Sequence, residues 1–400
     1  MITAIKFKNY KRFVEPQRIE IRPVTILVGR NSSGKSSISK LLPLLANATN
    51  GKIAEPFMFD NDGISVGASL SDVCHNGNII GLSLGVEFNC GASFDAEFVT
   101  DATRQVIQIS NYSIEYQNDA TVLKLKGRDS YESNEGRDVS YSTRDFRGLI
   151  NLRLIGKYGL SPHNFATLTD YIGPFRCLPE RTIYSKGKTQ RRRVGIKGEL
   201  AYQVLCHDKD VREKVSEWYE EAFDGCSLKV ERAGEGIYGA YHINMYKKNS
   251  DFGVNIVEEG QGMSQVLPIV VRANMMVKDS IVVVEQPELH LHPKAHASIA
   301  KLLAITSKET FDDGQPVNQH YLIETHSENI LLGIRDAVVD KTVDFGPDDV
   351  IIYFVQERND GTSQLRPITI DQAGELSSWP TGVFNEAYEL LRHIHEKAEQ

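Results

Sequence analysis

The sequence predicts an α/β protein, because apolar runs typical of buried strands alternate with helical segments, and a region of antiparallel character interrupts them. Residues 24–28 read Val-Thr-Ile-Leu-Val, a short run suited to a buried parallel strand. Residues 281–284 and 320–323 have the same character, and a predicted helix follows each of them. Between residues 60 and 145, alternating segments are separated by clusters of Asn, Asp and Gly, which favours an antiparallel sheet.

The other elements follow from the same spacing rules. Residues 1–28 are predicted to be strands, and apolar side chains at positions 38, 41, 42 and 45 predict a helix after residue 35. The further predictions are helices at 145–170 and 198–223, strands at 228–256, 350–355 and 365–370, and a closing helix at 384–396.

Composition limits the class of protein. The chain has 400 residues, of which 41% are hydrophobic and 24% charged, and its formal net charge is −8. Because the whole chain is acidic, any nucleic-acid contact must come from a local basic patch. No apolar run approaches the ~18 residues of a membrane span, and the five cysteines are scattered without CxxC spacing. We therefore expect a reduced, cytoplasmic protein without a membrane segment or a disulfide framework.

A phosphate-binding loop is the strongest motif. Residues 29–36 match G-x-x-x-x-G-K-[ST] between a predicted strand and a predicted helix. Such a loop wraps phosphates with backbone N–H groups at a helix start. Lys35 is expected to contact the β and γ phosphates of ATP, and the Ser36 hydroxyl is expected to bind Mg²⁺. The residues expected to contact ATP in this loop are Gly29, Arg30, Asn31, Ser32, Ser33, Gly34, Lys35, Ser36 and Ser37.

Polar residues end two of the apolar runs. Burying a carboxylate without a partner is unfavourable, so Glu285 is expected to hold Mg²⁺ together with Ser36. His290, His292 and His296 follow closely, but strand or helix geometry would not bring them together easily, and no Cys or acid completes a zinc set. After the run at 320–323, His326 is placed to position a water near a γ-phosphate.

In this order along the chain, the motifs resemble the ABC-type ATPase heads of the RecF, SMC and OLD-like superfamily. The likeness is greatest to the small prokaryotic AAA-family (ABC-like) ATPases of antiphage defence systems. It extends over most of the chain, on the segments Ile5–Phe13, Gly29–Ser36, Tyr171–Arg176, Gly260–Pro268, Glu285–Pro293, Glu324–Ser327 and Trp379–Glu386. The resemblance implies an ABC-ATPase head, in which helices cover a P-loop core sheet beside an antiparallel β lobe and a helical signature lobe.

The resemblance also implies how the chain is divided. The nucleotide-binding α/β core is expected at residues 1–60 and 258–400. An inserted lobe, first β-rich and then helical, is expected at residues 61–170. A coupling loop, a helical lobe and strands leading to the signature segment are expected at residues 171–257.

A homodimer follows from the resemblance as well, because two such heads trap ATP between the P-loop of one subunit and the signature segment of the other. Mapped onto this chain, Gly262, Ser264 and Gln265 would contact the γ-phosphate in trans, and His326 resembles the switch histidine. Residues 173–176 are the candidate coupling loop, although they lack the Gln that such loops usually carry. Without the resemblance, residues 260–265 could equally be a helix start with a Ser cap.

The chain departs from the superfamily at position 286. The residue after the Walker B acid is usually a Glu that is taken as the general base, whereas this chain has Gln286. A Gln side chain can orient a water but cannot accept its proton. Glu288 is the alternative carboxylate, so the catalytic candidates are Glu285, Gln286, Glu288 and His326. We expect firm ATP binding and slow hydrolysis.

One dense basic cluster leaves several partners open. Its members are Lys186, Lys188, Arg191, Arg192 and Arg193. Nucleic-acid phosphates, an acidic partner protein, the nucleotide and plain solvent are all compatible with such a cluster.

The function predicted from these motifs is an ATP-dependent switch or scaffold. It would dimerise on ATP and control a separately encoded effector protein in antiphage defence. No D-x-D pair of a Toprim nuclease follows His326, and no long heptad region is present. The alternatives are a RecF-like ATPase that binds DNA through the basic cluster in repair or recombination, and a nucleotide-binding module without useful hydrolysis.

Overall fold

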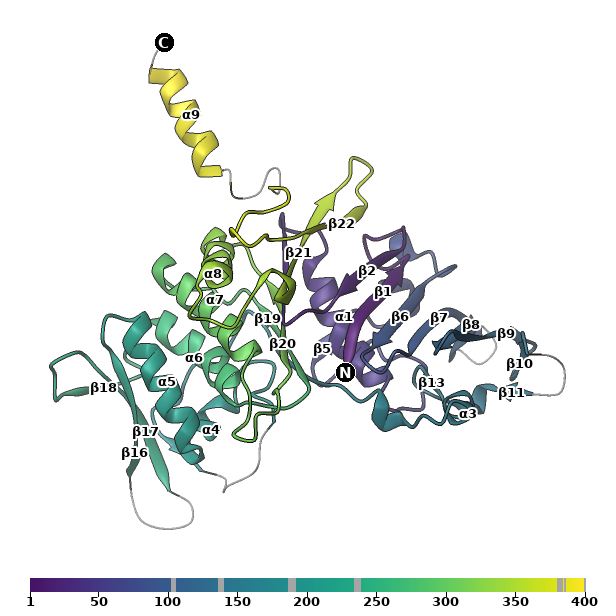
Figure 1. Ribbon diagram of the computed structural model, residues 1–400, viewed down its shortest axis with the longest axis horizontal. Helices are drawn as coiled ribbons and strands as arrows, with labels where there is room; N and C mark the ends of the chain where they lie inside the picture. Colours follow the sequence, from purple (N-terminus) through teal and green to yellow (C-terminus); the bar gives the residue numbers. More distant parts are fainter. Residues whose placement is uncertain are drawn as a thin grey trace.

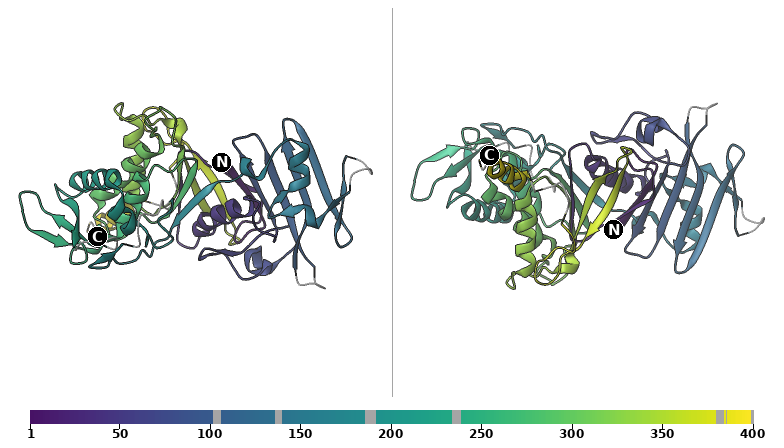
Figure 2. Two further views of the ribbon diagram at one scale, coloured as in Figure 1. Left: turned by 90° about the horizontal axis from the view of Figure 1, so that it is seen from below. Right: turned by 90° about the horizontal axis from the view of Figure 1, so that it is seen from above.

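The computed structural model of the chain describes residues 1–101, 106–135, 140–185, 192–233, 239–379, 384 and 386–398. A central sheet, mostly parallel, lies between an antiparallel sheet on one side and a helical lobe on the other (Figures 1 and 2). This arrangement confirms the predicted α/β class with an antiparallel β lobe beside a P-loop core. Within the described residues, no helix is long and apolar enough to cross a membrane.

The central sheet carries the predicted buried strands. Among the described residues, six strands form it in the order β14-β19-β20-β3-β21-β22. Neighbouring strands are parallel except for the last pair, β21 and β22. The strands are β3 (Val24–Gly29), β14 (Leu168–Ile172), β19 (Ser280–Glu285), β20 (Gln319–Glu324), β21 (Val350–Glu357) and β22 (Ser363–Ile368).

Alternate residues of the central sheet enter two different hydrophobic cores. Ile281 and Val283 of β19 pack in the core shared with α1 (Lys35–Ala48) and the antiparallel sheet. Val282 and Val284 pack in the core formed with the helical lobe. This is the two-residue period of a strand that is covered on both faces. Since every residue of β19 is buried, its carboxyl end is held firmly in place.

The antiparallel sheet begins with the first residues of the chain. Eight strands of the described chain form it in the order β11-β10-β9-β8-β7-β6-β1-β2. Because β1 pairs with β2 and β6, residues 1–20 belong to this sheet rather than to the central one. The strands are β1 (Ile2–Lys8), β2 (Gln17–Glu20), β6 (Ser83–Phe88), β7 (Ser93–Asp101), β8 (Val106–Tyr116), β9 (Asp119–Lys126), β10 (Ser130–Ser133) and β11 (Tyr141–Ser142). β14 spans the expected boundary at residue 170 and joins the central sheet. Strand pairing therefore crosses the expected division of the chain at two places, at β1 and β2 and at β14.

The helix predicted over residues 145–170 is wrong for most of that range. Among its described residues, α3 (Leu152–Lys157) is the one α-helix. Gly159 adopts φ of 67° just after α3, and Pro162 begins a 3₁₀ turn. Both residues end a helix, because a left-handed glycine terminates it and proline cannot continue it.

The helical lobe lies on the other side of the central sheet (Figure 1). The helices of this lobe are α4 (Ala201–His207), α5 (Lys209–Ala222), α6 (Gln261–Asn274), α7 (Pro293–Ser307) and α8 (Glu328–Val339). Between α4 and α5, the Asp208 side chain accepts a hydrogen bond from the Val211 N–H at 3.1 Å and caps the start of α5. A small sheet of β15 (Ile183–Tyr184), β16 (Ser227–Ala233), β17 (Ala240–Tyr246) and β18 (Gly253–Asn255) lies beside them.

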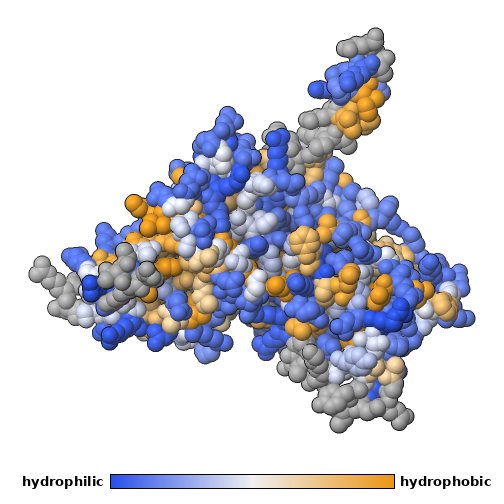
Figure 3. Space-filling view, turned by 180° about the vertical axis from the view of Figure 1, so that it is seen from behind, coloured by the Kyte–Doolittle hydropathy of each residue, from blue (hydrophilic) through white to orange (hydrophobic). Residues whose placement is uncertain are grey.

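The short elements complete the fold, and the last helix stands apart. The short elements are β4 (Asp60–Asn61), β5 (Ile64–Ser65), α2 (Leu70–Val73), β12 (Phe146–Arg147) and β13 (Ile150–Asn151). α9 (Glu386–Ala398) extends away from the rest of the molecule (Figure 1). Leu390, Leu391 and Ile394 are exposed on this helix, where Figure 3 shows apolar side chains along one side.

Candidate nucleotide-binding site

The loop between β3 and α1 adopts a conformation that needs glycine at both ends. Gly29 has φ of 152° and Gly34 has φ of 107°, values that residues with side chains rarely adopt. A Cβ atom on Gly29 would lie 2.7 Å from the Val355 carbonyl oxygen, and one on Gly34 would lie 3.0 Å from the Phe13 ring. The two glycines therefore let the loop curl closely against β21 and Phe13 at the start of α1, the arrangement that phosphate binding requires.

A cleft of about 510 Å³ opens beside this loop, within the range of about 300–1,000 Å³ that is usual for small-molecule sites. It is lined by the P-loop residues Asn31, Ser32, Gly34, Lys35, Ser36 and Ser37, and by Gln286, Glu324 and His326 from strand ends. Lys11, Arg12 and Cys74 also line it, although the sequence analysis assigned them no role. Lys11 and Arg12 lie in the segment 5–13, one of the segments on which the resemblance rests, so the sequence contained a signal for them. No sequence pattern marks Cys74 as a site residue.

Lys35 is the buried cation of the cleft. Its side chain is 3% exposed, and Nζ donates hydrogen bonds to the carbonyl oxygens of Gly29 at 3.0 Å and Arg30 at 2.8 Å. Burial lowers the pKa of Lys35, and the charges of Glu324 and Glu288 oppose this effect. A phosphate would supply the anionic partner that two neutral carbonyl groups do not.

Two buried carboxylates end neighbouring strands of the central sheet. Glu285 and Glu324 are direct partners in the parallel register of β19 and β20. Burial, and then the charge of Glu324, raise the pKa of Glu285 to about 7, while a hydrogen bond with Tyr171 lowers it. Among the described residues, the buried Oε1 atom of Glu285 has no hydrogen-bond partner. An unpartnered carboxylate oxygen of this kind fits a metal ion or an ordered water.

Glu324 is the acid that directly contacts the P-loop helix. Its carboxylate accepts hydrogen bonds from the Ser36 hydroxyl at 2.8 Å and the Ser39 hydroxyl at 3.1 Å, and burial raises its pKa. Ser36 thus contacts Glu324 rather than Glu285, and Glu285 does not line the cleft. Sequence reasoning missed Glu324, although it ends the run at 320–323 just as Glu285 ends the run at 281–284.

These oxygen atoms fit Mg²⁺. The ion prefers hydroxyl and carboxylate oxygens and is usually held by one or two protein carboxylates together with waters and phosphate oxygens. Ser36, Glu324 and Glu285 offer that donor set at the edge of the cleft. When bound, Mg²⁺ would offset the negative charge of the phosphates.

The histidines at 290, 292 and 296 have other surroundings. In the described part of the chain, no group of three or more His, Cys, Asp and Glu side chains is arranged to hold a metal ion. His292 accepts a hydrogen bond from the Lys294 N–H at 3.3 Å at the start of α7. His296 hydrogen-bonds the Ser327 hydroxyl at 2.8 Å.

Gln286, Glu288 and His326 lie together next to the strand ends. Gln286 has φ of 47°, and its N–H donates to the Glu324 carbonyl oxygen at 2.7 Å, which places Gln286 in the wall of the cleft. Glu288 Oε1 accepts a hydrogen bond from the His326 N–H at 2.8 Å, whereas its buried Oε2 has no partner among the described residues. Burial and then the charge of Lys35 lower the pKa of His326.

Arg176 connects the candidate coupling loop to this group. Its Nη2 atom donates to the carbonyl oxygens of Glu285 at 2.6 Å and Gln286 at 3.0 Å. Within the described structure, the buried Nε and Nη1 atoms have no partner, and burial lowers the pKa of Arg176 to about 10. The Gln265 amide donates to the Arg176 carbonyl oxygen at 3.3 Å, so the loop also contacts α6.

The signature segment forms the start of α6. This helix begins at Gln261, and the Ser264 and Gln265 side chains are buried against the core of their own chain, where they are 3% and 5% exposed. The Ser264 hydroxyl donates to the Gln261 carbonyl oxygen at 3.0 Å, so it is engaged within its own helix. A Cβ atom on Gly262 would lie 2.5 Å from the His290 carbonyl oxygen. The exposed positions at this helix start are Gly260 and Gln261, rather than Ser264 and Gln265.

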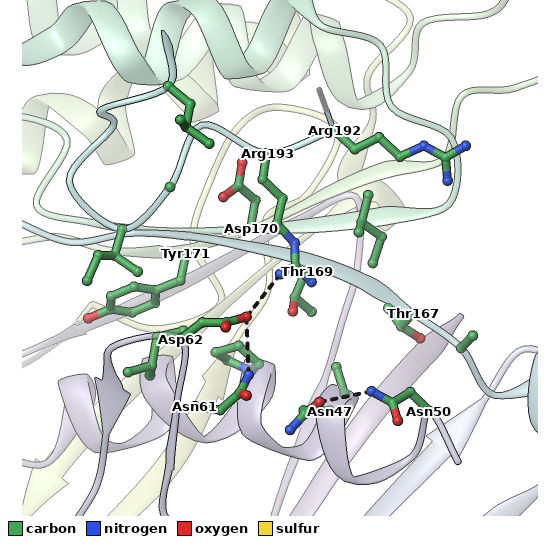
Figure 4. A pocket seen from close by; sticks show the side chains of 18 of the residues that line it. Asn47, Asn50, Asn61, Asp62, Thr167, Thr169, Asp170, Tyr171, Arg192 and Arg193 are labelled. Atoms are coloured by element: carbon green, nitrogen blue, oxygen red, sulfur yellow. Dashed lines mark hydrogen bonds and ion pairs between the residues drawn. The ribbon is translucent and has the colours of Figure 1, made fainter. Parts of the chain in front are cut away.

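A second, larger cavity lies away from the P-loop. It measures about 710 Å³, and Figure 4 shows Asn47 and Asn50 on one side of it and Arg192 and Arg193 on the other. Residues at the C-terminal end of α1 and the amino end of β14 line this cavity, and no P-loop residue does. Volume alone therefore does not identify the nucleotide site.

The basic cluster is only partly described. Lys186, Lys188 and Arg191 lie outside the described residues. Arg192 is exposed, and Arg193 Nη1 forms an ion pair with Asp62 at 3.3 Å (Figure 4). An exposed pair of this kind contributes about 0–1 kcal/mol to stability.

Comparison with protein families gives a match over most of the chain. Residues 24–332 match the family described as "AAA domain, putative AbiEii toxin, Type IV TA system". Residues 346–394 match a second family, described as "Protein of unknown function (DUF3696)". No match to a curated protein was found. The first match covers more than half of the chain and confirms the predicted resemblance to AAA-family ATPases.

Solved SMC heads are similar over nearly the whole chain. An SmcHead bound to the C-winged helix domain of ScpA is 14% identical with a TM-score of 0.46, and the match covers 93% of this chain and 98% of that one. The SMC head domain from Thermotoga maritima is 16% identical with a TM-score of 0.42, covering 92% and 98%. An Smc head with an extended coiled coil, bound to the C-terminal domain of ScpA derived from Pyrococcus furiosus, is 13% identical with a TM-score of 0.43, covering 98% and 99%.

Proposed function

The chain belongs to the family of AAA domains described as putative AbiEii toxins of type IV toxin–antitoxin systems, and from this premise we propose that it is an ATP-driven switch. Two copies dimerise on ATP and Mg²⁺ and hydrolyse the nucleotide slowly. In the dimeric state they control a separately encoded effector in prokaryotic antiphage defence. Lys35 and Ser36 hold the phosphates and the metal ion, Gln286 and His326 face the attacking water, and Glu288 holds the His326 backbone beside them.

The observation that carries the proposal is an incomplete ATP site. The cleft beside the P-loop is lined by residues from the loop, the strand ends and the N-terminal segment, and none of the residues 260–265 lines it. The exposed start of α6 therefore lies outside the cleft of its own chain. A second copy that presents this helix start would close the cleft and supply N–H groups to the γ-phosphate.

Exposed apolar side chains next to the signature segment support the second copy as the occupant. Arg181 forms an ion pair with Glu258, so the segment that follows the coupling loop lies beside the segment before α6. Phe175 is 82% exposed, Leu178 66% and Val257 41%. Apolar patches of this kind, surrounded by polar residues, usually mark an interface.

Slow turnover follows from the side chains that face the cleft. Among the described residues that line it, Glu324 is the one carboxylate, and two serine hydroxyls already occupy it. Gln286 lines the cleft with a neutral amide, and Glu288 lies one layer behind, bonded to the His326 N–H. A site that binds ATP without an accessible base would hold the dimer for longer, which suits a switch.

The experiment compares molecular mass and phosphate release for the wild type, Lys35→Ala and Gln286→Glu. With ATP and Mg²⁺, the wild type should become a dimer by light scattering and release phosphate slowly. Lys35→Ala should stay monomeric, because the phosphates lose their buried cation. Gln286→Glu should release phosphate about tenfold faster or more, since it restores a carboxylate that can accept the proton of the water.

Two results would contradict the proposal. A wild type that stays monomeric with ATP bound would remove the dimer. Fast hydrolysis that Gln286→Glu leaves unchanged would show that another group serves as the base. Phosphate release that rises with added DNA would instead favour the RecF-like alternative, and neutralising the exposed Arg192 should then reduce the effect.

A further inference from the structure

The Ser36 hydroxyl, which the P-loop motif offers to Mg²⁺, is already in contact with an acid that no motif marks. Glu324 lines the cleft, is 4% exposed and accepts hydrogen bonds from Ser36 and Ser39. We propose that Glu324 is a second carboxylate ligand of the Mg²⁺ that accompanies ATP, adjacent to Ser36 in the coordination shell. This inference rests on the proposed function, because it concerns the same nucleotide site.

The distance between the two oxygen atoms supports this role. Mg²⁺ takes octahedral oxygen ligands at about 2.0–2.1 Å, so neighbouring ligands lie about 2.9 Å apart. Ser36 Oγ and Glu324 Oε1 are 2.8 Å apart. The pair thus already has the separation of two adjacent ligands, and an ion could bind both oxygens without moving either side chain far.

The relation between the two acids points the same way. Glu285 and Glu324 are register partners at the same edge of the sheet, but only Glu324 is among the residues that line the cleft. Glu285 is partnered by Tyr171, and its other buried oxygen has no partner in the part of the chain that the structure describes. A cation near Ser36 would therefore meet Glu324 first and Glu285 beside it, and two carboxylates would make the site depend strongly on the metal.

A structural role predicts something different. If Glu324 only fixed the two serines, an amide would serve as well, since the Gln side chain can still accept from one hydroxyl and donate to the other. Glu324→Gln therefore keeps the hydrogen bonds and removes only the negative charge. The variant separates metal binding from serine positioning.

The experiment measures the affinity of a non-hydrolysable fluorescent ATP analogue in excess Mg²⁺ and in EDTA. For Glu324→Gln, affinity in Mg²⁺ should fall about tenfold or more, because a metal ligand is lost. In EDTA the same variant should bind the analogue about as tightly as the wild type or severalfold tighter, because a charge that repels the phosphates is gone. The opposite response in the two buffers is the signature of a ligand.

Matched variants make the outcome decisive. Glu328→Gln removes an exposed acid in the first turn of α8 and should leave both affinities unchanged. Glu324→Asp keeps the charge but withdraws it from Ser36, so part of the Mg²⁺-dependent gain should be lost, and this variant answers the question if Glu324→Gln does not fold. Equal affinities for Glu324→Gln and wild type in Mg²⁺, or the same fold-change in both buffers, would overturn the proposal. Dimerisation of the wild type on ATP is measured separately by light scattering, so a failure of the switch model is distinguishable from a failure of this one.

Discussion

The central sheet differs at the two ends of its strands in how its buried polar groups are paired. The row of carboxyl ends is called the carboxyl edge here, and the row of amino ends the amino edge. At the carboxyl edge, five buried atoms have no hydrogen-bond partner among the described residues, namely Ser33 Oγ, Arg176 Nε and Nη1, Glu285 Oε1 and Glu288 Oε2. Toward the amino edge, the fully buried Arg272 donates to Asp170 at 3.0 Å, to the Ser280 hydroxyl at 3.0 Å and to Gln319. The carboxyl edge is left incomplete, whereas the amino edge is closed except at His320, whose buried Nδ1 atom has no partner among the described residues.

Unpartnered buried polar atoms are a better indicator of a ligand-binding site in this chain than cavity volume. The larger cavity, of about 710 Å³, includes Asp170 in its wall, at the edge where the buried charges satisfy one another. The smaller cleft, of about 510 Å³, lies at the edge with unpartnered groups. Since native proteins satisfy most buried polar atoms, a concentration of unsatisfied ones indicates where a ligand completes the structure.

The largest predicted effect comes from breaking the closed network. Asp170→Ala leaves the Arg272 guanidinium buried without its carboxylate and also removes the acceptor of the Val194 N–H, which lies at 2.7 Å. Breaking one side of a buried ion pair costs about 3–5 kcal/mol, so the free energy of unfolding in urea should fall by that amount.

The control for this variant is Asp62→Ala, which breaks the exposed pair with Arg193. It should change the free energy of unfolding by no more than about 1 kcal/mol. If Asp170→Ala cost as little as this control, the amino edge would not be the closed structural region that the comparison requires.

The sequence predicted the two edges unequally. The P-loop and Glu285 were predicted as site residues because each has a local pattern, a spaced glycine motif in one case and an acid after four apolar residues in the other. Glu324 also follows an apolar run, but the sequence analysis expected one metal-binding acid and assigned that role to Glu285. The Arg272–Asp170 pair joins positions 102 residues apart and leaves no local signal.

The orientation of the signature segment was equally beyond the sequence. Ser264 and Gln265 face inward because they lie on the side of α6 that packs against the core. Spacing along the sequence does not tell which side of the first helical turn packs inward, because that depends on the neighbouring elements. The antiparallel strands were easier, because alternation defines their faces directly, as at β8.

A predicted effect of intermediate size, on the pH dependence of stability, concerns His320, which is the exception at the amino edge. The buried Nδ1 atom of His320 has no partner among the described residues, and burial lowers its pKa to about 4. Because this value lies below the usual value of about 6.5, the unfolded chain takes up the proton first as the pH falls. Stability should therefore be complete above pH 6.5 and fall between pH 6.5 and 4, by at most about 3 kcal/mol.

Unfolding experiments at several pH values check this prediction. His320→Asn should flatten the loss between pH 6.5 and 4, since a neutral side chain has no proton to gain. His393→Asn, on the exposed part of α9, should leave the pH profile unchanged. Identical profiles for wild type and His320→Asn would mean that other groups dominate acid unfolding.

The smallest predicted effect concerns the larger cavity itself. Arg193→Ala removes a side chain from its wall and an exposed ion pair with Asp62, so ATP affinity should change by less than about twofold. Lys35 lies at the N-terminal end of α1, whereas the larger cavity lies at its C-terminal end. Lys35→Ala should weaken ATP binding by about 100-fold, because it removes the buried charge–phosphate contacts. If Arg193→Ala also lowered ATP affinity tenfold, the two edges would be coupled. The physical route would run from the residue that follows, Val194, through Asp170 to Arg272 on α6, the helix whose exposed start is proposed to face the partner's nucleotide.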